Sequence, residues 1–105
     1  MTRPEIVENI KRVLWQNSPD VTAILYGSEA RGDARADSDI DLLLLVDKDA
    51  LSFNEKQAIT FPLYDIELNT GVAISPLVYT KKQWQNRPFR TPFYINVMNE
   101  GVQLQ

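Results

Sequence analysis

Hydrophobic positions change spacing along this chain in a way that predicts alternating helices and strands. Over residues 2–16 the apolar side chains follow helical spacing, with Ile6, Ile10, Val13 and Leu14 on one face. Residues 21–26 form a short run rich in β-branched and aromatic side chains, which favours a buried strand. Residues 39–46 predict a second strand. Its apolar part, Leu42 to Val46, is uninterrupted, so we expect a central strand that is buried on both faces.

Capping residues and helix breakers predict where the other elements begin and end. Thr2 with Glu5, and Ser52 with Glu55, match the capping-box spacing at a helix start. Gly32 and Gly71 suit helix C-termini. The pattern further predicts a helix over 28–35, a helix from 52 to about 69, a strand over 72–79, a helical turn over 80–84, a loop over 85–90, a helix opened by Thr91 and Pro92 and ended by Gly101, and a tail over 102–105 that docks or frays.

Two prolines constrain these predictions. Pro62 falls inside the 52–69 helix, where it would kink the helix or restart it with Thr60 as a new cap. Asp65 and Glu67 could instead alternate along a strand within 63–68. Pro76 cannot donate a hydrogen bond to a neighbouring strand, so its strand is expected at a sheet edge or bulged there.

Composition narrows the chemistry that this chain can perform. Its 105 residues predict one domain spanning 1–105, with 44% hydrophobic and 24% charged residues, as in ordinary globular proteins. Cysteine and histidine are absent, which excludes thiolate sites, imidazole-ligated zinc and the commonest general base. A net charge of −3 gives no basic surface for duplex nucleic acid or an anionic membrane. With no membrane span or signal peptide evident, the cytoplasm is the expected location.

The stretch from residue 26 to residue 42 combines a phosphate-sized turn with two acids. Gly27 and Ser28 end the first strand, and Asp39 and Asp41 begin the second. Gly27 would let backbone approach an anion closely, and Ser28 would cap a helix whose free N–H groups donate to phosphates. Asp39 and Asp41 share one strand face, where two like charges require a cation or a proton between them. Together these residues predict a nucleotide and a divalent metal.

These motifs resemble those of the nucleotidyltransferase superfamily that includes DNA polymerase β. The similarity is greatest to its small stand-alone members, the minimal nucleotidyltransferases, which carry Gly-Ser-x-Ala-Arg-Gly followed by Ser-Asp-Ile-Asp-Leu. Here the first segment begins at Gly27 and the second spans Ser38 to Leu42. The resemblance implies an α/β (α+β) fold, a polymerase β palm-like small mixed sheet flanked by helices. It also implies Mg²⁺-dependent transfer of a nucleotide, AMP from ATP first of all, to a hydroxyl.

Residue roles follow from this resemblance. Asp39 and Asp41 would be the catalytic residues and would hold Mg²⁺, which prefers oxygen ligands. Gly27, Ser28 and Arg31 would bind the triphosphate, although Arg31 has the equally simple alternative of pairing with a neighbouring aspartate. Small members of the group accompany HEPN-domain partners in toxin–antitoxin systems, so the resemblance implies that this chain is the antitoxin. Homo- or hetero-oligomers are both compatible with it.

One departure from the family pattern concerns a third carboxylate. Active relatives carry it on the strand beside the Asp-x-Asp strand, where this chain has Ser75 in the strand over 72–79. Asp65 or Glu67 could reach in from the preceding segment. Otherwise the function of a second metal is weakened or lost. The alternative hypothesis is therefore a catalytically impaired nucleotide-binding module that acts by contact with its partner protein.

Overall fold

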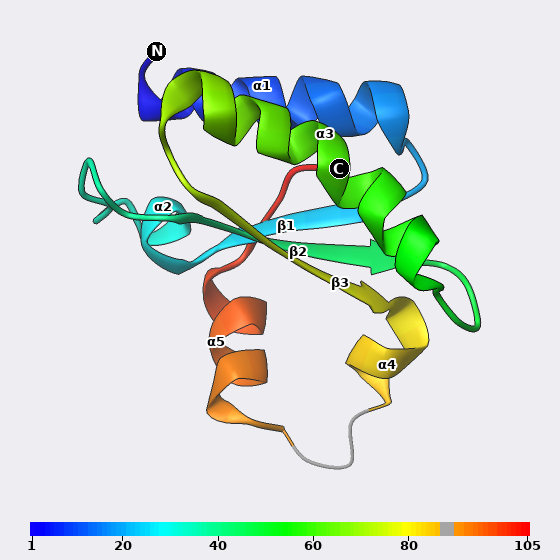
Figure 1. The fold of residues 1–105 in the computed structure, drawn as a ribbon. Helices are drawn as coiled ribbons and strands as arrows, with labels where there is room; N and C mark the ends of the chain where they lie inside the picture. Colours follow the sequence, from blue (N-terminus) through cyan, green and yellow to red (C-terminus); the bar gives the residue numbers. More distant parts are fainter. Residues whose placement is uncertain (87–89) are drawn as a thin grey trace.

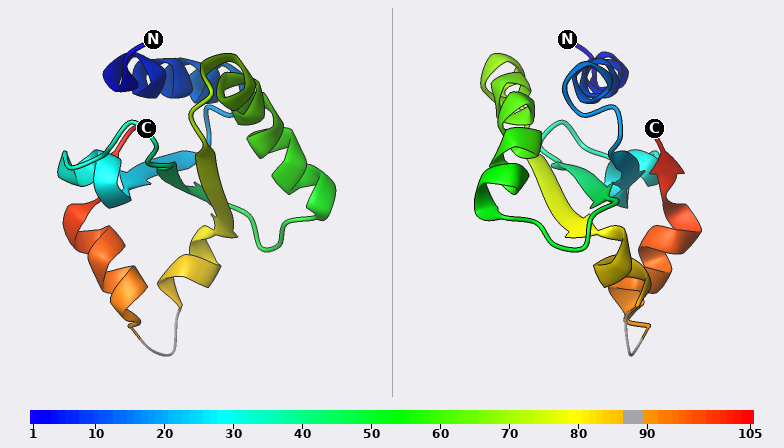
Figure 2. Two further views of the ribbon diagram at one scale, coloured as in Figure 1. Left: turned by 60° about the vertical axis from the view of Figure 1, so that its left-hand side comes forward. Right: turned by 90° about the vertical axis from the view of Figure 1, so that its right-hand side faces the viewer.

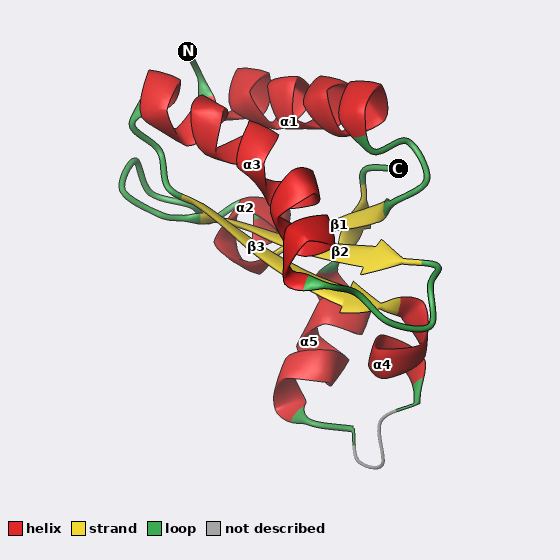
Figure 3. Cartoon of the chain, turned by 45° about the vertical axis from the view of Figure 1, so that its right-hand side comes forward, coloured by secondary structure: helices red, strands yellow, loops and turns green. Residues whose placement is uncertain are grey.

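The computed structural model of the chain describes residues 1–86 and 90–105. Helices and strands follow one another along it in the order that the sequence predicts (Figures 1 and 3). The loop predicted over 85–90 includes residues 87–89, which lie outside the described residues. The elements are α1 (Arg3–Asn17), β1 (Thr22–Tyr26), α2 (Gly27–Arg31), β2 (Ile40–Val46), α3 (Phe53–Thr70), β3 (Ile74–Thr80), α4 (Lys81–Gln85), α5 (Pro92–Glu100) and β4 (Val102–Gln103).

The strands form one mixed sheet in the order β3-β2-β1-β4. β1 pairs antiparallel with β2 and with β4, whereas β2 pairs parallel with β3. A parallel pair needs a crossover connection, and α3 supplies it. β2 is therefore central, as the continuous apolar run predicts. β3 is an edge strand, which confirms the prediction from Pro76, because an edge position tolerates the missing N–H.

Helices cover both faces of this sheet (Figures 1 and 2). α1 and α3 contact each other and lie on one face, where their apolar side chains pack against Leu42, Leu44 and Val46 of β2. α4 and α5 lie on the other face, where Leu43 and Leu45 pack against Trp84 and Val97. Consecutive leucines of β2 therefore enter different cores. No helix within the described ranges is long and apolar enough to cross a membrane.

Capping residues set the helix limits largely where the sequence places them. The Thr2 hydroxyl accepts the Glu5 N–H at the start of α1. Ser52 and Glu55 form the predicted capping box of α3, and Gly71 ends that helix in the left-handed conformation. Thr91 caps α5. The tail docks, because β4 pairs with Leu25 and Ile24 of β1.

The segment around Pro62 differs from two of the predictions. α3 runs without a break from Phe53 to Thr70 with Pro62 inside it, so the restart at Thr60 is wrong. The Thr60 hydroxyl donates to the Lys56 carbonyl oxygen (3.2 Å) within the same helix. The alternative strand within 63–68 is also wrong. Leu63 and Ile66 are both buried at helical spacing, and this packing fixes the helix in spite of the proline.

Candidate active site

Gly27 joins the end of β1 to the start of β2 through a close contact. Tyr26, the last residue of β1, pairs with Asp41 of β2 in the antiparallel register. Gly27 follows with φ of +75°, a conformation that favours glycine. A β-carbon at Gly27 would lie 2.4 Å from Asp41 Oδ2. The absence of a side chain therefore lets the turn approach the carboxylate directly.

Asp39, Asp41 and Ser75 lie together at one end of the sheet. Asp41 pairs with Ser75 in the parallel register between β2 and β3. The Ser75 hydroxyl donates to Asp39 Oδ2 (3.0 Å). Both acids thus lie toward Ser75, as the i, i+2 spacing predicts. The strand begins at Ile40 rather than at residue 39, so Asp39 is exposed whereas Asp41 is half-buried. These side chains share the sheet face of Leu43, the face that α4 and α5 cover farther along the strand.

The electrostatics of the site centre on Asp41. Burial raises the pKa of Asp41, the adjacent Asp39 carboxylate raises that pKa further, and the Arg31 guanidinium lowers it. The pKa of Tyr26, which pairs with Asp41 in the antiparallel register, is raised as well. Burial, and next the Asp41 charge, raise the pKa of Tyr26 to about 12, with a further contribution from Tyr79. The two carboxylates therefore repel each other in a partly desolvated place, where a cation would relieve the repulsion.

Arg31 binds two carboxylates rather than lying free. Its Nε donates to Asp33 Oδ2 (3.2 Å), and its Nη1 donates to Glu100 Oε1 (3.2 Å). Hydrogen bonds to Asp33 and then to Glu100 raise the pKa of Arg31 above its ordinary value. The same Glu100 oxygen accepts the backbone N–H of Gly27 (3.3 Å). Of the two predicted roles of Arg31, pairing with a nearby aspartate is observed, and sequence reasoning did not anticipate Glu100.

Ser28 does not cap the helix that follows the glycine. α2 begins one residue earlier, at Gly27, and its N-cap is Tyr26, which makes no side-chain capping bond. The helix ends at Arg31 with left-handed Gly32, so it is shorter than the predicted 28–35 segment. The Ser28 carbonyl accepts the N–H groups of Gly32 (3.0 Å) and Asp33 (3.1 Å), which closes the helix into the turn. Gly27, Ser28 and Arg31 nonetheless share this one short element beside Asp41.

Neither Asp65 nor Glu67 supplies a third acid in this arrangement. Glu67 Oε1 accepts the Ile74 N–H (2.7 Å) and thereby fixes the start of β3. Asp65 is exposed on α3. Over residues 1–86 and 90–105, no three histidine, cysteine, aspartate or glutamate side chains gather into a group that could hold a metal. Ser75 remains the residue that faces Asp39 and Asp41 from β3.

Arg3, the first residue of α1, supports the site from a distant part of the sequence, a role that local sequence patterns do not indicate. Its Nε donates to Glu29 Oε1 of α2 (2.6 Å), and its Nη2 donates to the Ser38 carbonyl oxygen (2.7 Å). Both charged side chains of this pair are mostly buried, with 17% and 15% of their surfaces exposed. Arg3 therefore ties α1 both to α2 and to the turn that leads into Asp39.

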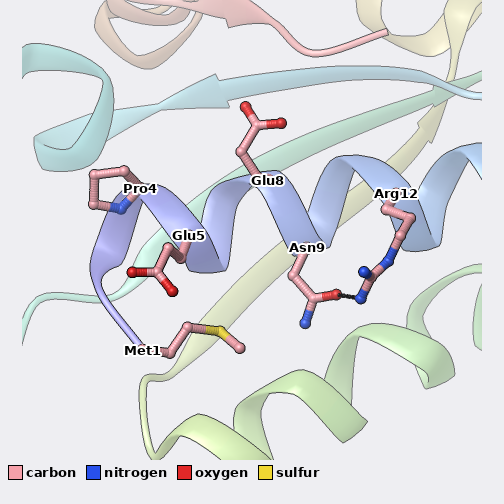
Figure 4. A pocket seen from close by; sticks show the side chains of 6 residues that line it. All are labelled: Met1, Pro4, Glu5, Glu8, Asn9 and Arg12. Atoms are coloured by element: carbon pink, nitrogen blue, oxygen red, sulfur yellow. Dashed lines mark hydrogen bonds between the residues drawn. The ribbon is translucent and has the colours of Figure 1, made fainter.

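A cavity of about 530 Å³ opens elsewhere, along α1. Figure 4 shows the side chains that line it, from Met1 and Pro4 to Asn9 and Arg12, with a hydrogen bond joining the last two. α1 lies on the sheet face opposite to that of Asp41, and none of the five predicted site residues lines this cavity. The chemistry-bearing residues and this cavity are therefore separate features.

The family of the chain is shown by sequence comparison. A family model described as polymerase beta, nucleotidyltransferase, matches residues 8–91. The chain belongs to this family. It is also similar to MJ0141 of Methanocaldococcus jannaschii, a protein that carries the name of a protein adenylyltransferase. The two are 38% identical over 81 residues, which cover 77% of this chain and 75% of the relative.

Solved structures with the same fold come from toxin–antitoxin complexes. This nucleotidyltransferase matches a chain of a toxin–antitoxin structure with AMP-PNP, with a TM-score of 0.62 and 19% identity over 94% of this chain and 72% of that one. A mutant of the toxin–antitoxin pair MntA-HpeT matches with a TM-score of 0.64 and 20% identity over the same shares. These likenesses confirm the palm-like nucleotidyltransferase fold.

Proposed function

We propose that this nucleotidyltransferase transfers AMP from ATP to a hydroxyl group of a partner protein and acts as the antitoxin of a pair with a HEPN-type toxin. The contact that carries the proposal is the one between Gly27 and Asp41. It sets a backbone able to approach phosphates against a carboxylate able to hold a metal. The spacing of the two segments matches the family motif, and the fold brings them within van der Waals reach.

Asp39 and Asp41 fit a divalent cation. They offer oxygen ligands, which Mg²⁺ prefers, and burial, followed by the neighbouring Asp39 charge, raises the pKa of Asp41. In this proposal both acids would hold Mg²⁺ when ATP binds. When bound, the ion would neutralise charge on the phosphates during the transfer. The protein itself would bind and orient the two reactants, ATP and the acceptor hydroxyl.

Gly27, Ser28 and Arg31 are proposed to bind the triphosphate. The Gly27 N–H and the Arg31 guanidinium already donate to a carboxylate in this structure, so they are placed to bind an anion. The acceptor hydroxyl oxygen would form a bond to the α-phosphorus of ATP as the bond to the bridging oxygen breaks. Pyrophosphate leaves, and the hydroxyl proton passes to solvent. This chemistry needs positioning and charge neutralisation more than a histidine base.

The choice of AMP and of a protein acceptor is supported by the relatives. The M. jannaschii protein carries the name of a protein adenylyltransferase, and one structural neighbour is a toxin–antitoxin structure with AMP-PNP, an ATP analogue. The HEPN identity of the partner is part of the proposal and rests only on the resemblance of the motifs to those of the minimal nucleotidyltransferases.

A labelling experiment tests this proposal. The chain is incubated with Mg²⁺, ATP labelled at the α-phosphate, and the protein encoded beside it, and labelled protein is resolved by electrophoresis and mass spectrometry. We expect AMP on a hydroxyl of the partner, and loss of the label with Asp39→Asn or Asp41→Asn. Asp37→Asn is the matched control, since Asp37 is an exposed carboxylate of the preceding turn and should leave labelling intact. Absence of label in every reaction would contradict the proposed transfer of AMP to the partner protein.

A second candidate function is favoured by Ser75. This serine, rather than an acid, pairs with Asp41 and hydrogen-bonds Asp39, so a nucleotide-binding module that neutralises its partner by contact is the alternative. Co-expression separates the two. If the Asp39→Asn variant still protects cells from the partner while no AMP is transferred, the contact mechanism replaces the catalytic one.

A further inference from the structure

Glu100 places a negative charge on the donors that the proposed function gives to ATP. Its carboxylate accepts the Gly27 N–H and binds the Arg31 guanidinium through both oxygens, at 3.2 and 3.4 Å. Glu100 is the last residue of α5 and lies 73 residues from Gly27 in the sequence. Only 24% of its side chain is exposed. The carboxylate therefore bridges α5 and α2 beside Asp41.

The backbone that carries Glu100 is fixed from both sides. A β-carbon at the next residue, Gly101, would lie 2.5 Å from the Val97 carbonyl oxygen and 2.7 Å from the Ile24 side chain. Directly afterwards β4 pairs with β1, and the Leu104 N–H donates to the Ala23 carbonyl oxygen (2.7 Å). The corner between α5 and the sheet thus cannot shift easily, whereas the glutamate side chain can change rotamer.

An acid at this position is not explained by the stability of α5. Carbonyl groups at the end of a helix favour cations, and an acid there is unfavourable. Arg31 and the Gly27 N–H compensate the Glu100 charge. The hydrogen bond from the Gly27 N–H is long at 3.3 Å, and an ion pair whose arginine side chain is 46% exposed contributes little free energy, so the contact can be displaced.

We propose that the Glu100 carboxylate occupies the phosphate-binding donors of the nucleotide site and that the triphosphate must displace it. This inference rests on the proposed function. The single Gly27 N–H is engaged by Glu100, so a phosphate oxygen that takes this donor replaces the carboxylate. Arg31 has further N–H groups and can exchange one anion for the other without moving. Glu100 thereby weakens nucleotide binding and favours ligands that carry several phosphate charges and a metal.

Nucleotide binding by Glu100 variants tests the proposal. Isothermal titration with Mg²⁺–ATP is compared for the wild-type chain, Glu100→Gln, which removes the charge, and Glu100→Ala, which also removes the acceptor. We expect both variants to bind ATP roughly threefold to tenfold more tightly. Inorganic tripolyphosphate with Mg²⁺ should show the same gain, because the competition concerns the phosphates. Thermal unfolding checks that both variants stay folded.

Asp33→Asn is the matched control for charge. Asp33 also pairs with Arg31, but it makes no contact with the Gly27 N–H in this structure, so its loss should change the Kd for ATP less than twofold. An equal gain in Asp33→Asn would reduce the effect of Glu100 to general repulsion and overturn the proposal. Weaker ATP binding in the Glu100 variants would show instead that Glu100 holds Arg31 in place.

The outcomes also separate this inference from the proposed function. If the wild-type chain and the variants bind ATP equally well, nucleotide binding stands and the displacement of Glu100 is wrong. If ATP binds to none of them while all are folded, the nucleotide site itself is wrong, and the displacement with it.

Discussion

Gly27 is the residue on which the geometry of the site depends most closely. Two separate requirements meet there, a positive φ and the lack of a side chain facing Asp41. Gly32 shares only the first requirement, because a β-carbon at that position would meet nothing within 4 Å. The chain thus contains a pair of glycines that separates backbone strain from contact with the carboxylate.

Gly27→Ala should therefore cost more than Gly32→Ala. Each alanine costs about 1–2 kcal/mol for the left-handed conformation. At position 27 the new methyl also pushes against Asp41 Oδ2, so we expect a larger loss of stability and at least a tenfold loss of AMP transfer, whereas Gly32→Ala keeps most of its activity. Urea unfolding and the labelling assay measure the two effects. Equal losses in both variants would show that the close approach to Asp41 is not needed.

Among the elements, α3 depends on a capping box that is linked to a surface charge. Ser52 and Glu55 exchange hydrogen bonds at its start, and Lys48 binds the Glu55 carboxylate. The hydrogen bond from Lys48, followed by those from Ser52, lowers the pKa of Glu55. Because α3 connects the parallel strands β2 and β3, its first turn also helps to place Ser75 against Asp41.

This lowered pKa predicts a pH dependence of stability. The folded state favours the charged carboxylate, so the contribution of Glu55 is present above the ordinary pKa of glutamate and is lost as the pH falls through the lower folded pKa. Glu55→Gln should be slightly less stable than the wild type at pH 7, and the difference should shrink as the pH falls below the ordinary pKa of glutamate. Denaturant unfolding at pH 7, 5 and 3 measures it. A difference that stays constant over this range would exclude the carboxylate charge as its origin.

At the scale of the whole molecule, the sequence predicts what is encoded locally. The run Leu42 to Val46 indicates a strand buried on both faces, and the Gly-Ser and Asp-x-Asp spacing indicates which strand ends meet. Contacts between distant residues were missed. The bond from Gly27 to Glu100 and the one from Arg3 to Glu29 join residues 73 and 26 positions apart, and neither leaves a periodic signal. Packing likewise overrides propensity at Pro62, which the buried Leu63 and Ile66 hold within α3.

The burial of β2 on both faces can be tested by substitutions on each face. Leu43 and Leu44 are adjacent and both fully buried, yet they pack into the separate cores beneath α4–α5 and beneath α1–α3. Leu43→Ala and Leu44→Ala should therefore each lower the free energy of unfolding by about 2–5 kcal/mol. Leu77→Ala is the matched control, since Leu77 pairs with Leu43 from the edge strand β3 and has 37% of its surface exposed, and it should cost less. Urea unfolding measures all three. If Leu43→Ala cost no more stability than Leu77→Ala, the residues beneath α4 and α5 would not form a true core. The sheet would then be stabilised only from the face that α1 and α3 cover.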